Sequence, residues 1–122
     1  MAGPLKGHTA VSVTDLAFSP DGRILASVGG DVRLWNVQSG TAIGNPLAVE
    51  GASGVEFSPN GDTVATVDAY SKLRFWNTET GALQGTPLTA PGCDMQVAFN
   101  PSGTMLAAAC GLGDDKIRTW VR

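Results

Sequence analysis

The sequence predicts an all-β fold built from three repeats of about forty residues. The tract Phe, Ser or Asn, Pro, any residue, Gly occurs three times, and each copy is followed by a small-residue segment and then by Arg-x-Trp. The tryptophans stand at 35, 76 and 120, 41 and 44 residues apart, and Pro-Leu pairs at 4, 46 and 87 keep the same order. A period of ~40–45 residues is typical of four-stranded propeller blades and excludes the shorter helical repeats.

Each repeat is predicted to consist of short strands, named a, b, c and d in chain order, joined by tight turns. In the first a–b turn, Phe18-Ser19-Pro20-Asp21-Gly22, Pro20 fixes φ and Gly22 releases the chain from the turn. Expected strands are 11–18, 24–28, 32–37 and a weaker 41–47 in repeat one, then 53–58, 64–68, 72–77 and 82–88 in repeat two. Repeat three has expected strands at 95–99, 105–109 and 116–121, without a strand d of its own.

Composition limits the class of protein. The 122 residues suffice for one domain with a core, and 16 Gly, 7 Pro and no sustained helical period suit short strands and turns. A net charge of -3 without a basic stripe argues against nucleic-acid binding. The start is not typical of a signal peptide, and no apolar stretch is long enough to span a bilayer, so we expect a cytoplasmic protein that does not bind membranes. Cys93 and Cys110, without C-x-x-C spacing, are expected to be small buried thiols.

Repeat one carries a family resemblance in Gly7-His8-Thr9, in the tract Phe18 to Gly22, in Leu25-Ala26-Ser27 and in Val32 to Asn36. These residues resemble a WD40 repeat, and their sequence is similar to that of repeats in bacterial WD40 proteins. The resemblance implies propeller blades with the d–a and b–c loops on one face and the a–b and c–d loops on the other. It also implies a non-catalytic protein-interaction scaffold.

Many WD40 blades join His, Ser or Thr, Asp and Trp in one hydrogen-bonded set, and the resemblance places that set on residues of each repeat. The matching residues are His8, Ser27, Asp31 and Trp35 in repeat one, Thr66 and Trp76 in repeat two, and Asp114 and Trp120 in repeat three. The b–c turn of repeat one is two residues shorter than usual. In repeat two Tyr70 stands where the family has Asp.

Three blades leave two faces uncovered, so we expect a ring closed by oligomerisation. The single domain 1–122 divides into blade 1 at 1–45, which begins with the tail of a d strand, blade 2 at 46–86 and blade 3 at 87–122. We expect residues 2–6 of one chain to pair as strand d beside residues 116–122 of the next, giving six blades from a dimer or nine from a trimer. The ring-closure strands contain Ala2, Pro4, Leu5, Lys116, Ile117 and Trp120. A fragment of a longer propeller is the alternative.

Residues that differ between the blades indicate a recognition surface on the d–a and b–c loops. The candidates for binding a protein or peptide are Glu50, Asp68, Tyr70, Asp94 and Asp115. Tyr70 is their one aromatic residue, a type enriched at contact hot spots, and the carboxylates make the surface acidic. A variable loop surface without a ligand is the alternative.

No constellation typical of catalysis, metal or cofactor binding is found. His8 is the single histidine, and a catalytic role would need a nucleophile or carboxylate converging on it. Asp114 and Asp115 lack the spacing of a calcium loop. The predicted function is thus a self-assembling interaction scaffold that is no enzyme and needs no metal or cofactor. The alternatives are a structural or engineered assembly module and a lectin-like ring that binds small ligands.

Overall fold

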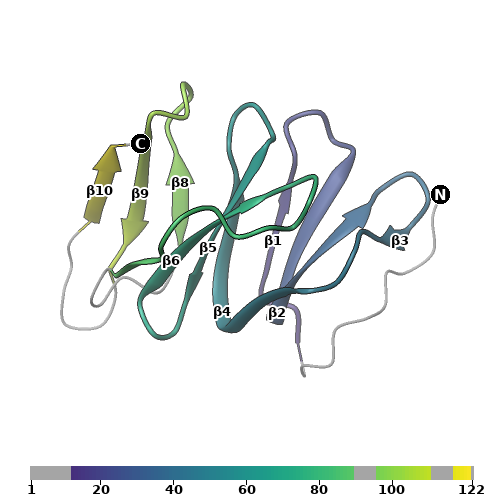
Figure 1. The fold of residues 1–122 in the computed structure, drawn as a ribbon, viewed down its shortest axis with the longest axis horizontal. Helices are drawn as coiled ribbons and strands as arrows, with labels where there is room; N and C mark the ends of the chain where they lie inside the picture. The colour runs from purple at the N-terminus through teal and green to yellow at the C-terminus, as the bar shows by residue number, and fades with distance from the viewer. Residues whose placement is uncertain (1–11, 90–95, 111–116, 122) are drawn as a thin grey trace.

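The computed structural model describes residues 12–89, 96–110 and 117–121, and its elements are all β-strands (Figure 1). This confirms the predicted fold class. Within these ranges no helix is long and apolar enough to cross a membrane. Repeat one contains β1 (Asp15–Phe18), β2 (Ile24–Asn36) and β3 (Thr41–Ala42). Repeat two contains β4 (Leu47–Phe57), β5 (Thr63–Asp68), β6 (Lys72–Asn77) and β7 (Leu88–Thr89). Repeat three contains β8 (Val97–Phe99), β9 (Met105–Ala109) and β10 (Ile117–Val121).

The long strand β2 folds back on itself and contains both predicted strands b and c. The Val37 N–H donates to the Arg23 carbonyl at 3.0 Å, although a straight strand of this length would hold its ends roughly 40 Å apart. Gly30 lies between the two arms with φ 84°, a conformation that glycine adopts without steric cost. Trp35 on the second arm reaches Ser27 on the first. The b–c hairpin of repeat one is therefore the counterpart of β5 and β6.

The outer strands are shorter than the sequence predicts. Strand β3 pairs only Thr41 and Ala42 with the end of β2, although strand d was expected over 41–47. In repeat two an isolated bridge joins Trp76 to Leu83, and β7 (Leu88–Thr89) covers only Leu88 of the expected 82–88. Gly and Pro interrupt both segments, and proline cannot donate a ladder hydrogen bond.

Repeats one and two share one sheet, which differs from the separate four-stranded sheets that the repeat pattern suggests. Strand β4 begins at Leu47 and pairs with β2 before it pairs with β5, so β1 to β7 form a single seven-stranded antiparallel sheet. Strands β8 to β10 form a second, three-stranded sheet. Figure 1 shows the three repeats side by side, with β8–β10 at one end of the row and β1–β3 at the other.

The core lies between successive repeats. One cluster joins repeats one and two, and a second joins repeats two and three. The first contains Ala26, Val28, Val32, Leu34, Leu47, Val49, Ala52, Val55, Phe57, Val64 and Trp76. The second contains Ala65, Val67, Leu73, Val97, Leu106, Ala108 and Cys110, with Phe75, Leu88, Phe99 and Trp120 packed against it. Burial of apolar surface between repeats is therefore the main stabilising contact of the fold.

Candidate protein-interaction surface

Two of the three tryptophans are tied to a hydroxyl of the neighbouring strand. The Trp35 Nε1–H donates to Ser27 Oγ at 2.7 Å, and the Trp76 Nε1–H donates to Thr66 Oγ1 at 3.0 Å. Both rings are buried. In repeat three the corresponding position is Ala108, which has no side-chain oxygen, and Trp120 is only half-buried. The structure thus joins the Trp and hydroxyl members of the expected set in repeats one and two.

The aspartate of repeat one lies at the surface of its turn. Asp31 accepts long hydrogen bonds of 3.4 Å from Nε and Nη2 of Arg33, and both side chains are partly exposed. The two other candidates for the hydrogen-bonded set, His8 and Asp114, lie outside the described residues. The ring-closure residues Ala2, Pro4, Leu5 and Lys116 also lie outside them, whereas Ile117 and Trp120 belong to β10.

Asp68 is a correction to the expected recognition surface, because its side chain is buried with only 1% exposed. Its Oδ1 accepts the backbone N–H of Tyr70 at 2.8 Å and that of Lys72 at 3.1 Å, while Oδ2 forms an ion pair with Arg74. A buried carboxylate needs such partners, and here they fix the β5–β6 turn. Asp68 is therefore a structural residue of the turn.

A signal for this role is present in the sequence. Asp68 lies two residues beyond Thr66, which pairs with Arg74, so alternation along the strands places all three side chains on one face of the hairpin. In repeat two the aspartate stands at the end of strand b instead of within the turn. Its distance from the tryptophan therefore differs from that of Asp31 in repeat one.

Tyr70 remains on the candidate surface and is 64% exposed. A Cβ built on Gly51 would lie 3.6 Å from Cε2 of Tyr70, and the Ala69 N–H donates to the Gly51 carbonyl at 3.0 Å. The d–a segment around Glu50, which belongs to β4, and the b–c turn of repeat two are thus neighbours. Asp94 and Asp115, the two further candidates, lie outside the described residues.

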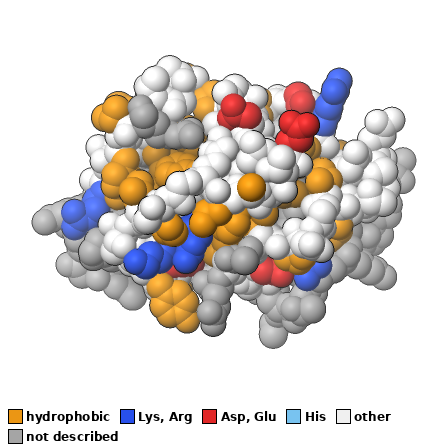
Figure 2. All heavy atoms as spheres, in the orientation of Figure 1, with side chains coloured by type: hydrophobic (Ala, Val, Ile, Leu, Met, Phe, Trp, Pro, Cys, Tyr) orange, Lys and Arg blue, Asp and Glu red, His pale blue; other side chains and the backbone are white. Residues whose placement is uncertain are grey.

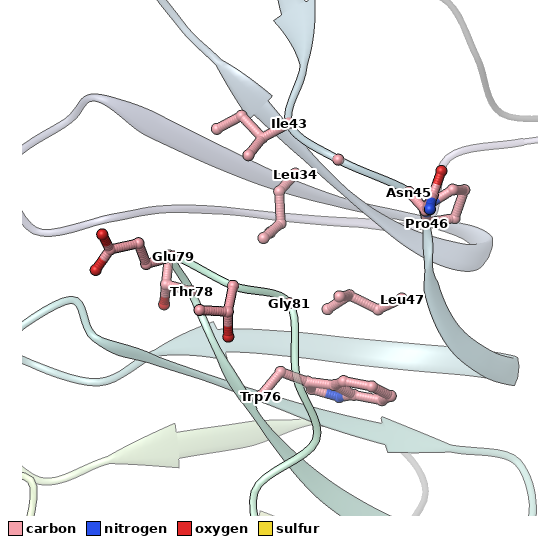
Figure 3. A pocket seen from close by; sticks show the side chains of 11 residues that line it. Leu34, Ile43, Asn45, Pro46, Leu47, Trp76, Thr78, Glu79 and Gly81 are labelled. Carbon is pink, nitrogen blue, oxygen red and sulfur yellow. The ribbon is translucent and has the colours of Figure 1, made fainter.

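A cleft of about 350 Å³ opens between repeats one and two, on the side of the c–d turns (Figure 3). Leu34, Leu47 and Trp76 form its apolar walls, whereas Glu79 points away from them (Figure 3). Thr78 also lines the cleft; its side chain is only 5% exposed and its Oγ1 has no hydrogen-bond partner. A buried hydroxyl without a partner is uncommon in proteins. The sequence gives no sign of this cleft.

The charged groups in the described part of the chain form no metal site. No three His, Cys, Asp or Glu side chains among the described residues lie close enough to hold a metal ion. The face seen in Figure 2 has acidic groups near its upper edge and scattered basic ones, so its described side chains form no broad basic patch.

Burial, and then the nearby Asp15 carboxylate, raise the pKa of Glu56. Cys110 is disulfide-bonded, which corrects the expectation of a buried thiol; Cys93 lies outside the described residues.

The fold and these tryptophan pairs define a repeat protein of antiparallel β-hairpins packed face to face. The WD40 family (WD domain, G-beta repeat) matches residues 2–36 and 88–120, more than half of the chain. The chain belongs to the WD40-repeat family, which confirms the resemblance seen in the sequence.

Several curated proteins are similar over part of the chain. Apoptotic protease-activating factor 1 of Danio rerio is 41% identical over 70 residues, which are 57% of this chain and 6% of that protein. U3 small nucleolar RNA-associated protein 21 of Saccharomyces cerevisiae is 39% identical over 64 residues, 51% of this chain and 7% of that protein. WD repeat-containing protein 36 of Homo sapiens is 42% identical over 62 residues, which are 49% of this chain and 7% of that protein. The matched region is thus a small part of each relative.

Proposed function

We propose that this chain is a non-catalytic protein-interaction scaffold that recognises a protein or peptide through the b–c turn and d–a segment of repeat two. Membership of the WD40 family supports the scaffold role. The observation that carries the site is Tyr70, a mostly exposed aromatic ring on a turn that Asp68 holds in place. An aromatic side chain on a rigid turn loses little conformational entropy when it enters a partner's pocket, which favours affinity.

The test is capture of a partner by the purified chain with a photo-crosslinking residue beside Tyr70, at Ala69. We expect Tyr70→Ala to lose the cross-linked partner. Leu83→Ala is the matched control, because Leu83 is also an exposed hydrophobic residue but follows β6 on the outer edge. Equal capture by the two variants would contradict recognition through Tyr70.

We also propose that the three blades, 1–45, 46–86 and 87–122, assemble with those of further copies into a closed ring, as a dimer with six blades or a trimer with nine. Strand β10 pairs only with β9 among the described strands, and a groove of about 360 Å³ runs along Thr89 and residues 117–120. An open strand edge of this kind favours pairing with another chain. Sedimentation velocity tests the proposal: a monomer of 12.5 kDa at all concentrations would refute it.

The small-ligand alternative, a lectin-like module, is favoured by the cleft beside Trp76. An apolar floor and one unpartnered hydroxyl suit a ligand with an apolar face and a hydrogen-bonding group, as sugars have. Binding on a glycan array that Thr78→Val abolishes would support this function over the scaffold. A purely structural or engineered module would give neither a captured partner nor a bound glycan.

A cytoplasmic location stays a prediction.

A further inference from the structure

We propose that two exposed apolar faces at opposite ends of the described repeats pack against each other between two copies of this chain, in the register that the internal repeats already use. The inference rests on the proposed self-assembly and assigns its surface. The leading face consists of Leu16 and Phe18 of β1 and Leu25 of β2. The trailing face consists of Ala107 and Ala109 of β9 and Ile117 of β10.

The contact between repeats one and two provides the first template. Repeat one contributes residues from the two arms of β2, and repeat two contributes residues from β4, β5 and β6, all of them buried in one cluster. The contributing residues are Ala26, Val28, Val32 and Leu34 on one side and Val55, Phe57, Val64 and Trp76 on the other. The preceding repeat thus contributes only small and branched side chains, and the following repeat contributes two valines together with the large rings of Phe57 and Trp76.

The contact between repeats two and three uses the same positions. Strand pairing aligns the repeats without ambiguity, because Phe18 pairs with Leu25, Phe57 with Val64 and Phe99 with Leu106. In this alignment repeat two contributes Ala65, Val67, Leu73 and Phe75, and repeat three contributes Val97, Phe99, Leu106 and Trp120. The interface is therefore a repeated unit, and its two sides are known position by position.

The same alignment identifies the corresponding positions on the outer side of repeat one and on the outer side of repeat three. These positions are the two faces. Leu16 and Phe18 correspond to Val55 and Phe57, yet they are 58% and 62% exposed where their counterparts are 2% and 3% exposed. Ile117 corresponds to Val32 and Leu73, yet it is 75% exposed where both counterparts are fully buried. Large apolar side chains that are buried wherever a neighbouring repeat is present indicate the same kind of neighbour here.

The a–b turns provide second, independent evidence for the register in which successive repeats pack. A Cβ built on Gly61 would lie 3.4 Å from Cδ of Pro20, and one on Gly103 would lie 3.2 Å from Cδ of Pro59. The glycines of the second and third Phe-x-Pro-x-Gly tracts therefore lie against the proline of the preceding repeat. Gly22 has no atom within 4 Å of such a Cβ, and Pro101 is exposed. Pro101 of one copy is the proline that fits against Gly22 of the next.

A second copy is the occupant that the geometry favours, since it carries both complementary faces and the matching turn. The contact joins two different surfaces, so it is head to tail and either closes a ring or propagates. Two positions of the trailing face depart from the template: Thr119 stands where Leu34 and Phe75 contribute apolar surface, and Ala109 stands where Val28 and Val67 do. We therefore expect this interface to bury less apolar surface than the two internal ones.

The experiment uses sedimentation velocity on the full chain with one blocked face at a time. Phe18→Asp blocks the leading face and Ile117→Asp blocks the trailing face; both side chains are exposed, so each variant should still fold, which circular dichroism checks. We expect each variant alone to associate at least tenfold more weakly than the wild type. An equimolar mixture should form a one-to-one pair, because one intact interface remains between the two variants. Leu83→Asp, at an exposed hydrophobic position outside both faces, is the control and should assemble as the wild type does.

The outcomes separate this inference from the proposed self-assembly. If the wild type assembles and both variants assemble equally well, self-assembly stands and the assignment of the faces is wrong. If the mixture forms no pair, the contact is not head to tail and the assignment is again wrong. A wild type that stays monomeric overturns both proposals.

A matched glycine pair tests the register alone. Gly22 and Gly44 both have positive φ, 73° and 63°, and neither has an atom within 4 Å of an added Cβ. Gly22→Ala and Gly44→Ala therefore carry the same kind of backbone strain in the monomer. Only Gly22→Ala should weaken association, by a few-fold, because its methyl group would meet Pro101 of the preceding copy. Equal association of the two variants would overturn the predicted Pro101 contact.

Discussion

The b–c turns of repeats one and two use an aspartate in different ways. In repeat one Asp31 lies within the turn, is partly exposed, and makes long contacts with Arg33. In repeat two Asp68 ends strand β5, is buried, and binds two backbone N–H groups of the turn as well as Arg74. The same residue type is thus buried in one turn and partly exposed in the other, and we expect the buried carboxylate to contribute more to stability.

Removing the two carboxylates should give the largest difference. Asp68→Ala leaves Arg74 and two turn N–H groups without their acceptor, and we expect a loss of about 3 kcal/mol in the free energy of unfolding. Asp31→Ala should cost less than Asp68→Ala, because its ion pair with Arg33 is long and partly exposed, and such pairs contribute little. Urea denaturation followed by tryptophan fluorescence measures both.

Asp68→Asn separates the two contributions of this side chain. The amide oxygen can still accept from the turn, whereas the charge that pairs with Arg74 is lost. We expect a cost between those of Asp31→Ala and Asp68→Ala. Equal costs for Asp31→Ala and Asp68→Ala would show that burial of Asp68 does not set its contribution.

Both turns should favour glycine at their position of positive φ, so removing glycine from one turn and adding it to the other should change stability with opposite signs. Gly30 has φ 84° in the first turn, and Ser71 has φ 61° in the second, where a residue with a Cβ is strained. Gly30→Ala should lower the free energy of unfolding by about 1 kcal/mol, whereas Ser71→Gly should raise it by ~0.5 kcal/mol because relief of strain outweighs the added chain entropy. Thermal unfolding of the two variants checks the signs; a loss for Ser71→Gly would mean that its side chain contributes more than the strain costs.

The turns also show what the sequence could and could not predict. Periodicity and turn residues predicted β5, β6 and β9 closely, because each strand is bounded by a turn with Gly or Ser and contains the apolar side chains that the core needs. The Trp35 and Trp76 pairs followed from the family resemblance. The sequence places Asp68 on the recognition surface because it belongs to a loop that differs between the repeats, and only the position of Arg74 across the hairpin reveals its burial.

Other features depend on contacts between repeats, which a pattern within one repeat does not encode. Strand β4 extends back to Leu47 because it pairs with β2 of the preceding repeat, and this pairing joins the first two repeats into one sheet. Strands β3 and β7 are short because Gly and Pro leave few ladder hydrogen bonds. The cleft at Thr78 likewise forms between two repeats.

Thr78 and its counterpart Val37 extend the comparison to the c–d side. Both backbone N–H groups donate to the residue before strand b, Asp62 and Arg23, so the two positions are equivalent. Thr78→Val removes a buried hydroxyl without a partner and keeps the shape, so we expect a gain of about 1 kcal/mol in the free energy of unfolding. The reverse change, Val37→Thr, should cost less than that, because Val37 is only half-buried. Destabilisation by Thr78→Val in chemical denaturation would mean that the hydroxyl has a partner in solution.

The smallest expected effect concerns Glu56, which stands on strand a where repeats one and three have Ala17 and Ala98. Burial and Asp15 raise the pKa of Glu56, so the folded state binds this proton more tightly than the unfolded state does. The free energy of unfolding therefore decreases as the pH rises from the ordinary glutamate pKa through the raised one, and it is unaffected below that interval.

Glu56→Gln should remove this decrease and stabilise the protein near neutral pH by roughly 0.5 kcal/mol or less, since the side chain is only half-buried and solvent screens its charge. Urea titrations between pH 4 and pH 8, which bracket the ordinary glutamate pKa of about 4.3, measure the slope. Glu79→Gln, at an exposed position outside the core, is the control and should leave the decrease in place. If the free energy of unfolding has the same slope against pH in Glu56→Gln and in the wild type, the decrease comes from another group. The Glu56 carboxylate would then be as well solvated as that of a surface residue.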